Sequence, residues 1–408
     1  MEKANIPKIR FDKFNDDWEQ RKLGDMGSTF TGLSGKTKED FGHGEAKFIT
    51  YMNVFSNPVA NLEMTESVEI DTKQNSVKKG DVFFTTSSET SEEVGMSCVM
   101  PENKENIYLN SFCFGYRPTE KFDLDYLAYV LRTASFRKEM TFLAQGISRY
   151  NISKNKVMEV SIPVPNLEEQ AMIGGYFSNL DHLITLHQRK YEKLQMIKKS
   201  MLEKMFPQNG EKKPEIRFEG FTDDWEQRKL GEVATYKNGK GHEDNQSDEG
   251  TYELINLNSI SIDGGLKPSG KFIEDGSDTL LENDLVMVLS DVGHGDLLGR
   301  VAIIPENNRF VLNQRVALLR INDDTNPYFL FSIINRHQDY FKKLGAGSSQ
   351  LNISRGTVED FVVDYPCQDE QRKIAKCFQN LDTLITLHQR KLEKLRNIKK
   401  SMLEKMFV

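Results

Sequence analysis

The stretch NLDHLITLHQRKYEKLQMIKKSMLEKMF, residues 179–206, returns almost unchanged as NLDTLITLHQRKLEKLRNIKKSMLEKMF at residues 380–407, displaced by 201 positions. A second string, DDWEQRKLG, occupies residues 16–24 and recurs without change at residues 223–231, displaced by 207. Because the two displacements nearly agree, the chain is one duplicated unit and not a set of separate motifs. The residues between these matched ends have diverged far more. Two near-identical frames therefore hold two different inserts, which suits the recognition of two unlike targets.

Length and composition indicate a soluble protein of two or three domains. The chain has 408 residues, and each half is long enough to bury its own core. A hydrophobic content of 38% and a mean hydropathy of −0.55 leave no apolar run that could span a membrane. The start MEKANIPKIRF has no apolar stretch typical of a signal peptide, so we expect a cytoplasmic protein without membrane association. The four cysteines show no CxxC spacing and are expected to be reduced thiols that bind no metal.

Each half predicts a compact α+β domain. Trp18 and Trp225 stand in matched segments and are expected to anchor the core of each domain. Short β-type runs between turns follow, at residues 47–55, 81–86 and 112–118 in the first half and at 252–260, 284–290 and 315–321 in the second. A helical pattern comes next in each half, at residues 124–140 and 327–344.

Each domain is followed by a long helix with a coiled-coil pattern. Apolar residues recur at spacings of three and four over close to five heptads, with four polar intrusions. The first seam runs through Ile173, Phe177, Leu180, Ile184, His187, Tyr191, Leu194, Lys198, Met201 and Met205, and the second through Ile374, Phe378, Leu381, Ile385, His388, Leu392, Leu395, Lys399, Met402 and Met406. The simplest partner of each helix is the other copy. An antiparallel pair would relate the halves by a pseudo-twofold axis, with the domains at opposite ends.

These patterns divide the chain into five segments. The polar, turn-rich string PQNGEKKPE is typical of a linker. The predicted segments are a first variable domain at residues 1–164, a first helix at 165–207, a linker at 208–217, a second variable domain at 218–365 and a second helix at 366–408.

Net charge argues mildly against a nucleic-acid partner, but its distribution is uneven. The formal net charge is −7, and acids gather in strings such as SSETSEEVG and HEDNQSDEG. Residues 182–207 carry six lysines and arginines against two glutamates. This basic helical segment is either a solvated face or a surface that meets phosphates or a partner.

Motifs for catalysis are scarce. GLSGKTKED lacks the first glycine of a P-loop, and the glycines of GHGDLLG are wrongly spaced for a dinucleotide-binding turn. NPYF at residues 326–329 resembles the adenine-gripping motif of amino-methyltransferases, but it lacks the second proline and stands at a predicted helix start. We interpret it as a proline in the first turn of a helix, and we predict neither a catalytic residue nor a metal ligand.

Signals for binding are stronger. The matched strings GISRYNISKNK at residues 146–156 and GSSQLNISRGT at 347–357 combine glycine, hydroxyls, amides and basic residues. Asn, Gln and Arg can bond base edges, whereas Ser, Thr and Lys suit phosphates. Each string is either a turn that closes its domain or a surface that contacts DNA, and lysines in earlier loops are weaker candidates. The candidate DNA-binding residues are Lys36, Lys38, Ser148, Arg149, Tyr150, Asn151, Lys154, Lys240, Ser349, Gln350, Asn352 and Arg355.

Together, these features resemble the specificity subunit of a type I restriction and modification system. The likeness covers essentially the whole chain and is carried by two variable domains, each followed by a near-identical helix that begins through PNLEEQ at residues 165–170 or PCQDEQ at 366–371. DDWEQRKLG before each domain and the Gly80-Asp81 pair before a β-run add to it, although the second copy has Asn283-Asp284 at that point.

The resemblance implies a fold and a role. It implies two target-recognition domains separated by an antiparallel helical spacer, which bind the two unlike halves of a gapped DNA site. Such a chain is not itself an enzyme. It would bind double-stranded DNA and two adenine-specific methyltransferase subunits, and through them nuclease and translocase subunits. It would bind no cofactor, because the methyltransferase subunits use S-adenosylmethionine and hold the flipped adenine.

Two other functions stay open. One is a stand-alone DNA-binding or scaffold protein that dimerises through the coiled coil, and co-purification with methyltransferase subunits would distinguish it. The other is an enzyme that fuses recognition with methyl transfer. The chain has no room for a catalytic domain beyond the two repeats, which weighs against that function.

Overall fold

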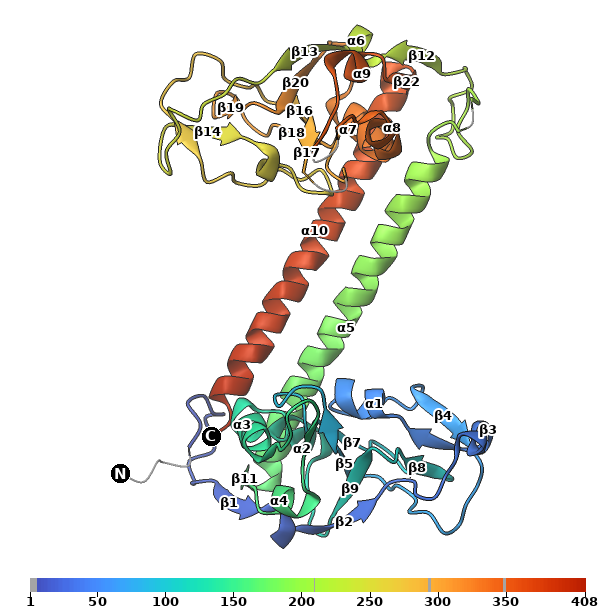
Figure 1. Ribbon diagram of the computed structural model, residues 1–408, viewed down its shortest axis with the longest axis vertical. Coiled ribbons are helices and arrows are strands. Elements are labelled where there is room, and N and C mark those ends of the chain that lie inside the picture. Colours follow the sequence, from blue (N-terminus) through green and yellow to red (C-terminus); the bar gives the residue numbers. More distant parts are fainter. Residues whose placement is uncertain (1–5, 209, 293–294, 348–349) are drawn as a thin grey trace. The chain divides into compact units, whose positions relative to one another are not determined.

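The computed structural model describes residues 6–208, 210–292, 295–347 and 350–408. The chain forms two compact units, the first made of Met1–Gln188 with Arg390–Val408 and the second of Arg189–Gln389. The two long helices, α5 (Leu167–Lys204) and α10 (Gln368–Lys405), each contribute residues to both units (Figure 1). The duplication seen in the sequence is therefore also present in the structure, as two α+β units.

The first unit is built around two small sheets. A four-stranded antiparallel sheet has the order β2-β9-β5-β7, and a three-stranded sheet has the order β4-β3-β8 with β3 and β8 parallel. The two-stranded pairs β1-β11 and β10-β6 complete it. Its strands are β1 (Glu19–Lys22), β2 (Gly27–Thr31), β3 (Phe41–Ile49), β4 (Thr65–Val68), β5 (Val82–Thr85), β6 (Ser87–Ser88), β7 (Ser97–Val99), β8 (Ile107–Leu109), β9 (Cys113–Pro118), β10 (Tyr150–Asn151) and β11 (Ser161–Val164), and its shorter helices are η1 (Leu23–Asp25), η2 (Lys38–Asp40), α1 (Tyr51–Ser56), α2 (Leu124–Val130), α3 (Ala134–Leu143) and α4 (Lys154–Met158).

The second unit repeats this topology strand for strand. Its sheets have the orders β13-β20-β16-β18 and β15-β14-β19, with pairs β12-β22 and β17-β21. Two inserts that share little sequence therefore fold on one plan. The strands are β12 (Glu226–Lys229), β13 (Ala234–Asn238), β14 (Tyr252–Ile255), β15 (Phe272–Ile273), β16 (Leu285–Val288), β17 (Ser290–Asp291), β18 (Val301–Ile303), β19 (Phe310–Leu312), β20 (Val316–Ile321), β21 (Leu351–Asn352) and β22 (Val362–Tyr365), and the shorter helices are α6 (Leu230–Val233), η3 (Leu257–Ser259), α7 (Pro327–Arg336), α8 (Gln338–Leu344) and α9 (Arg355–Glu359).

Most of the predicted elements are confirmed, and two strand predictions are wrong in part. Residues 51–55 belong to helix α1, because the Thr50 side chain accepts a hydrogen bond from the Asn53 amide and caps a helix there. At the matching place in the second unit, Asn256 caps η3, so residues 257–259 are not strand either. The helix predicted from Pro327 is confirmed, with Asn326 accepting from the amides of Tyr328 and Phe329.

The end of each long helix completes a core. Met205 and Phe206 follow α5 and are buried in the second unit, where the Phe206 ring lies 6.0 Å from that of Trp225. Met406 and Phe407 follow α10 and are buried in the first unit, where the Phe407 ring lies 6.4 Å from Trp18. Each helix thus begins in one compact unit and ends in the core of the other. Both tryptophans are core residues, as predicted.

Within each unit, the two long helices run antiparallel. In the first unit, Asp181 pairs with Lys399 while Gln188, further along α5, accepts from Arg396, which lies earlier in α10. All the predicted seam positions are buried or half-buried, including the polar ones. The antiparallel pairing is thereby confirmed inside each unit, while the position of the domains at opposite ends of the helices stays a prediction.

A Tyr-Asp-Lys cluster fixes the helix register in the first unit. The Lys399 Nζ lies 2.6 and 2.7 Å from the two carboxylate oxygens of Asp181, and the Tyr129 hydroxyl donates to the same carboxylate at 2.8 Å. Burial raises the pKa of Tyr129, so this hydroxyl stays a donor. The cluster ties α2, α5 and α10 together, because each of its three residues comes from a different helix.

The second unit has the same cluster. Lys198 Nζ lies 2.6 Å from Asp382, and the Tyr328 hydroxyl donates to that carboxylate at 2.5 Å. Polar residues in a helical seam commonly fix register, and here each predicted lysine intrusion has an aspartate partner.

The glutamate-glutamine pair at each helix start is buried. In the first unit, Arg10 forms two hydrogen bonds with Glu169, of 2.7 and 2.9 Å, and Gln170 accepts from the backbone of Asp123, the cap of α2. In the second, Arg217 bonds Glu370 twice at 2.8 Å, and Gln371 accepts from the backbone of Asn326. The ion pair joins the start of each long helix to the segment that precedes the domain. The glutamine joins the same helix start to the cap of α2 or α7 within the domain.

Two further observations concern the chain as a whole. All four cysteines are free thiols. Within residues 6–208, 210–292, 295–347 and 350–408, no helix is long and apolar enough to cross a lipid bilayer.

Replacing Phe407 by alanine should lower the free energy of unfolding of the first unit by about 3–5 kcal/mol, because a buried aromatic ring is removed from its core. The measurement is urea unfolding followed by Trp18 fluorescence in a Trp225→Phe background. The matched variant, Phe206→Ala, should act on the Trp225 signal in a Trp18→Phe background. A Trp18 transition that Phe407→Ala leaves unchanged would contradict the role given to this ring.

Candidate nucleic-acid interface

The first candidate string forms a tight hairpin. Gln145 and Asn151 exchange two backbone hydrogen bonds, of 2.9 and 2.8 Å, and enclose residues 146–150. Gly146 has φ +146°, and a Cβ there would lie 2.0 Å from the carbonyl oxygen of Arg149, so only glycine fits. Beyond the hairpin, the Ile152 amide bonds to the Thr86 carbonyl and attaches the turn to the strand β6.

The side chain of Arg149 is placed over this strand. Its Nη2 donates to the Ser87 hydroxyl at 3.1 Å, and Ser87 itself pairs through its backbone with Asn151. Ser148 and Arg149 are exposed, while Tyr150 is half-buried. The side-chain nitrogen of Asn151, Nδ2, lies 3.4 Å from the Arg149 carbonyl oxygen, which is at the long end of the range for a hydrogen bond.

The second hairpin is built in the same way. Ala346 and Asn352 exchange two backbone hydrogen bonds of 2.9 Å each, and Gly347 has φ +138°. Gln350 Nε2 donates to the Ser290 hydroxyl on β17, and Asn352 Nδ2 donates to the Gln350 carbonyl at 3.1 Å. Ser349 lies outside the described residues. Both strings are therefore turns that close their domains, and a role in contacting DNA stays a prediction for the side chains that they expose.

The helices after the hairpins carry the next two candidates. Lys154 is the first residue of α4 and is exposed. Arg355 is the first residue of α9, where its Nη2 lies 2.8 Å from Glu359 and its guanidinium lies 5.4 Å from the centre of the Tyr236 ring. Lys154 is thus free to approach a phosphate, whereas Arg355 is already paired within its helix.

The three loop lysines are not equivalent. Lys36 Nζ lies 3.0 Å from Asp71, and its side chain is only 12% exposed. Hydrogen bonds from Gln74 and Lys36 lower the pKa of Asp71 to about 2, so this partner stays ionised at neutral pH. Lys38 is exposed in η2, and the 72% exposed Lys240 lies 3.7 Å from Asp278. Exposure therefore favours Lys38 and Lys240 over Lys36 as DNA contacts.

The sequence did not indicate a cavity beside the first hairpin. It has a volume of about 450 Å³ and is lined by Tyr51, Met52, Phe55, Ser87, Ser88, Glu89, Glu93, Ser148 and Arg149. The rings of Tyr51 and Phe55 stack with centres 6.1 Å apart, and the Tyr51 hydroxyl donates to the Ser87 carbonyl at 2.7 Å. Thr50 was the feature of the sequence that could have indicated this cavity, because it caps helix α1, whose Tyr51, Met52 and Phe55 line one side of it.

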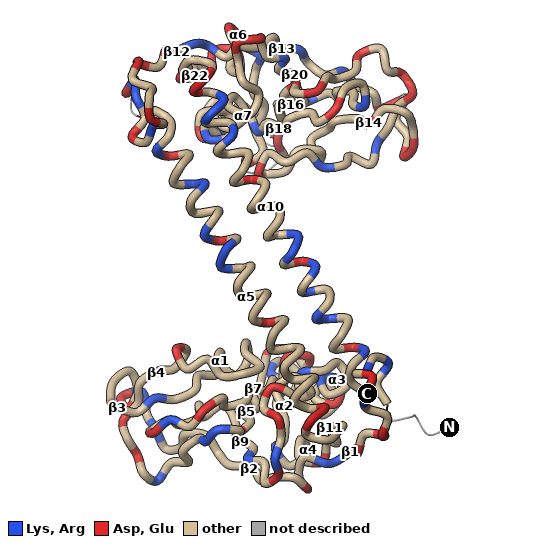
Figure 2. The backbone as a smooth tube through the Cα atoms, turned by 180° about the vertical axis from the view of Figure 1, so that it is seen from behind, with Lys and Arg blue, Asp and Glu red and all other residues tan. Residues whose placement is uncertain are grey.

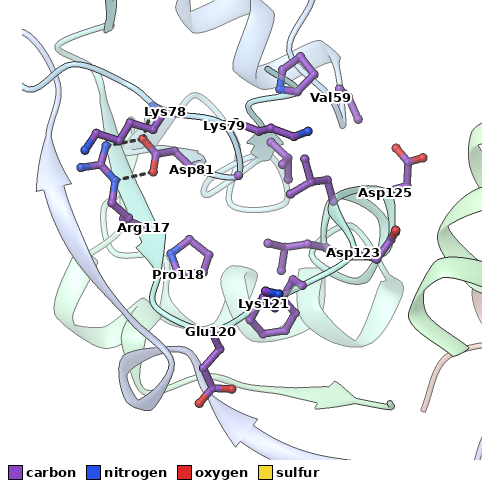
Figure 3. Close-up of a pocket in the computed structure, with 16 residues that line it drawn as sticks. Val59, Lys78, Lys79, Asp81, Arg117, Pro118, Glu120, Lys121, Asp123 and Asp125 are labelled. Atoms are coloured by element: carbon purple, nitrogen blue, oxygen red, sulfur yellow. Dashed lines mark hydrogen bonds and ion pairs between the residues drawn. The ribbon is translucent and has the colours of Figure 1, made fainter. Parts of the chain in front are cut away.

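A larger cavity, of about 760 Å³, lies at another place in the first unit (Figure 3). Two hydrogen bonds of 2.7 Å join Arg117 to the buried Asp81, and both residues line the cavity. The same ion pair recurs in the second unit between Arg320 and Asp284, which identifies it as part of the duplicated frame. The remaining lining mixes Lys78, Lys79 and Lys121 with Glu120, Asp123 and Asp125, and this mixture of charges selects no single class of ligand.

Basic residues are spread along both long helices (Figure 2). Of the six in residues 182–207, Lys198 pairs with Asp382 and Lys204 with Glu215. The other four, Arg189, Lys190, Lys193 and Lys199, are exposed. The segment therefore combines two ion pairs with four exposed basic side chains, and its two glutamates, Glu192 and Glu203, are exposed as well.

Comparison with known proteins gives the family. The model of the type I restriction modification DNA specificity domain matches residues 15–196 and again residues 222–397. A putative type I restriction enzyme specificity subunit of Methanocaldococcus jannaschii, MjaX, is 25% identical over 98% of this chain and 95% of its own length. The MjaVIII specificity subunit of the same organism is 26% identical over 68% of each chain.

Solved structures agree on the fold. The crystal structure of the type I restriction-modification S subunit from M. genitalium aligns with a TM-score of 0.68 at 17% identity, over 99% of both chains. A structure described under complex assembly and conformational transition of the type I R-M system aligns with a TM-score of 0.52 at 17% identity, over 96% of this chain and 97% of that one.

Both copies of the duplicated unit match the family model, and the two hairpins lie within the matched ranges. The chain therefore belongs to the type I restriction-modification DNA specificity family and is a DNA sequence-recognition subunit.

Proposed function

We propose that this chain recognises a gapped, asymmetric DNA target, with one half-site bound by each compact unit. The proposal rests on a repeated frame that carries different side chains at matched positions. The hairpins share their backbone bonds, their glycine and their Asn-Ile-Ser core, while Arg149-Tyr150 in one stands where Gln350-Leu351 stands in the other. Equal placement of unlike side chains suits two unlike half-sites.

We further propose that the chain is not catalytic and acts with two methyltransferase subunits. These subunits would bind S-adenosylmethionine and hold a flipped adenine, and nuclease and translocase subunits would join through them. Type I restriction-modification specificity is the described role of the family, and the sequence offers no catalytic motif for methyl transfer. The alternative, a stand-alone DNA-binding or scaffold protein, would purify without such subunits.

The long helices offer two identical surfaces for identical partners. The octapeptide LITLHQRK occurs at residues 183–190 and at 384–391. Leu183 and Leu186 are 40% and 39% exposed, and their counterparts Leu384 and Leu387 are 42% and 44% exposed. These leucines lie outside the predicted seam, and all four are among the exposed large apolar residues. One pair of exposed leucines is present in each unit, and each pair is followed in the sequence by Arg-Lys, which suits one methyltransferase subunit per copy of the octapeptide.

The double change Leu183→Asp with Leu186→Asp should remove one of the two methyltransferase subunits, because charges are placed in one of the two docking surfaces. Leu384→Asp with Leu387→Asp should remove the other, and the combined variant both. Native mass spectrometry of the co-expressed complex measures the stoichiometry.

The control for this experiment is Met196→Asp. Met196 is 66% exposed on α5, but Asn397 stands at its place in the second copy, so this position is not part of the repeated surface. The complex should keep two methyltransferase subunits. If both leucine double variants also keep two, the docking surface is wrong, whereas a wild-type chain that binds none would favour the scaffold function.

The helices are also expected to set the gap between the half-sites. Deleting residues 191–197 and 392–398 together removes one heptad from each helix outside the two octapeptides, or about 10 Å. At about 3.4 Å per base pair, the preferred gap should shorten by about three base pairs. Methylation mapping measures the gap, and a variant in which the same seven residues are repeated should lengthen it by a similar amount. A gap that stays the same in both variants would rule out the helices as the spacer.

A further inference from the structure

The two hairpins differ at one matched position that is held by a matched contact. Arg149 and Gln350 are related by the same displacement, 201 residues, as the long helices. Each donates from its terminal nitrogen to a serine hydroxyl on the neighbouring two-residue strand, Ser87 for Arg149 and Ser290 for Gln350. In both units that serine pairs through its backbone with the asparagine of the shared Asn-Ile-Ser core. The frame therefore presents two different side chains from one geometry.

The serine contact leaves the recognition groups available. Arg149 uses one Nη2–H on Ser87, so its Nη1 hydrogens and second Nη2–H can still form two parallel bonds. Gln350 uses Nε2 on Ser290, and no described residue donates to its Oε1. The second Nε2 hydrogen forms only a long bond, of 3.4 Å, to Asn352 Oδ1, and the acceptor oxygen remains, so the glutamine can exchange that weak bond for contacts with a base. The serine hydroxyl restricts the rotamers of each side chain before DNA arrives, which lowers the entropic cost of ordering it.

The surroundings of Arg149 favour a base over a phosphate. The cavity beside it contains the exposed carboxylates of Glu89 and Glu93, which would repel a phosphate group. Carboxylates do, however, accept hydrogen bonds from cytosine N4, while arginine bonds O6 and N7 of the paired guanine. An arginine and two acids on one wall thus match the major-groove edge of a G·C pair.

We propose that this matched position determines one base in each half-site, guanine through Arg149 and adenine through Gln350. The glutamine assignment follows from its free acceptor oxygen, which can accept from N6 of adenine, and from the Nε2 hydrogen held only by the long bond to Asn352, which can donate to N7. This inference rests on the proposed recognition of a gapped target and names the side chains that select one base in each half. Tyr51 and Phe55 form the apolar wall next to Arg149, and Leu257 stands at the Tyr51 position of the second unit.

The test is a reciprocal exchange, Arg149→Gln and Gln350→Arg, in the full chain co-expressed with its methyltransferase, followed by methylation mapping. Arg149→Gln should change one guanine of one half-site to adenine and leave the other half-site intact. Gln350→Arg should change one adenine to guanine in the opposite half-site. At each changed position, the preference for the original base should fall by roughly 5- to 150-fold.

Matched controls use the same chemical changes away from the hairpins. Arg21, which pairs with Glu120, and Gln227, which bonds Asp364, are in the duplicated DDWEQRKLG segments. Arg21→Gln and Gln227→Arg should leave the methylated motif unchanged.

The outcomes separate this inference from the proposed function. If wild-type chain directs methylation to a gapped motif but the exchanges alter no base, or alter a position that is not guanine or adenine, the assignment is overturned. If wild-type chain directs no gapped motif, the proposed function fails first. Should Arg149→Gln abolish all methylation, Arg149→Lys decides, because it keeps the charge and loses the forked geometry. Relaxed choice at one guanine supports the inference, and an unchanged motif refutes it.

Discussion

The structure depends on one packing arrangement, the burial of each long helix's end in the compact unit that it reaches. Phe206 packs against Trp225 and Phe329, and Phe407 packs against Trp18 and Tyr126. Neither unit has a complete core without the helix that begins in the other unit. This requirement accounts for the near identity of the helical segments, because both copies must end in a similar aromatic core and pair through the same seam. Asp181 with Lys399, and Asp382 with Lys198, then fix the register of that pair within each unit.

A division of roles follows from this arrangement. The residues that repeat are those that join elements, such as Glu169 with Arg10 or Asp81 with Arg117, and their partners recur in the second unit. The residues between the matched ends differ widely, in the cores as well as on the turns, and Arg149 and Gln350 differ at a matched hairpin position. The carboxylate of each of these ion pairs is buried, so loss of its arginine would leave it without a counter-charge and these positions tolerate little change. A side chain on an exposed turn can vary at small cost to stability. The duplicated frame can therefore carry different recognition surfaces without losing its fold.

The sequence revealed the duplication, the long helices and most strands, because these depend on local patterns that repeat along the chain. It failed where a local cap overrode the β-type pattern, as at Thr50 and Asn256, each of which starts a short helix. The sequence also could not predict contacts between residues that are far apart along the chain. The hairpins were predicted as turns or DNA contacts, but Ser87 is 62 residues from Arg149, and only the fold brings them together. The pairing of Lys36 with Asp71, which makes this lysine the weakest DNA candidate of the loops, has the same origin.

The tyrosines that bond Asp181 and Asp382 have the same role at different positions in their helices. Tyr129 is the sixth residue of α2 and Tyr328 the second of α7, so no simple alignment of the two copies would pair them.

We expect two unlike recognition units to direct methylation to one two-part DNA site. The most direct test is single-molecule mapping of DNA methylation in cells that express this chain with its methyltransferase subunit, compared with cells from which the chain is deleted. We predict N6-methyladenine in a single gapped, asymmetric motif that disappears with the chain. A palindromic or ungapped motif, or methylation by an active methyltransferase that does not depend on the chain, would contradict it.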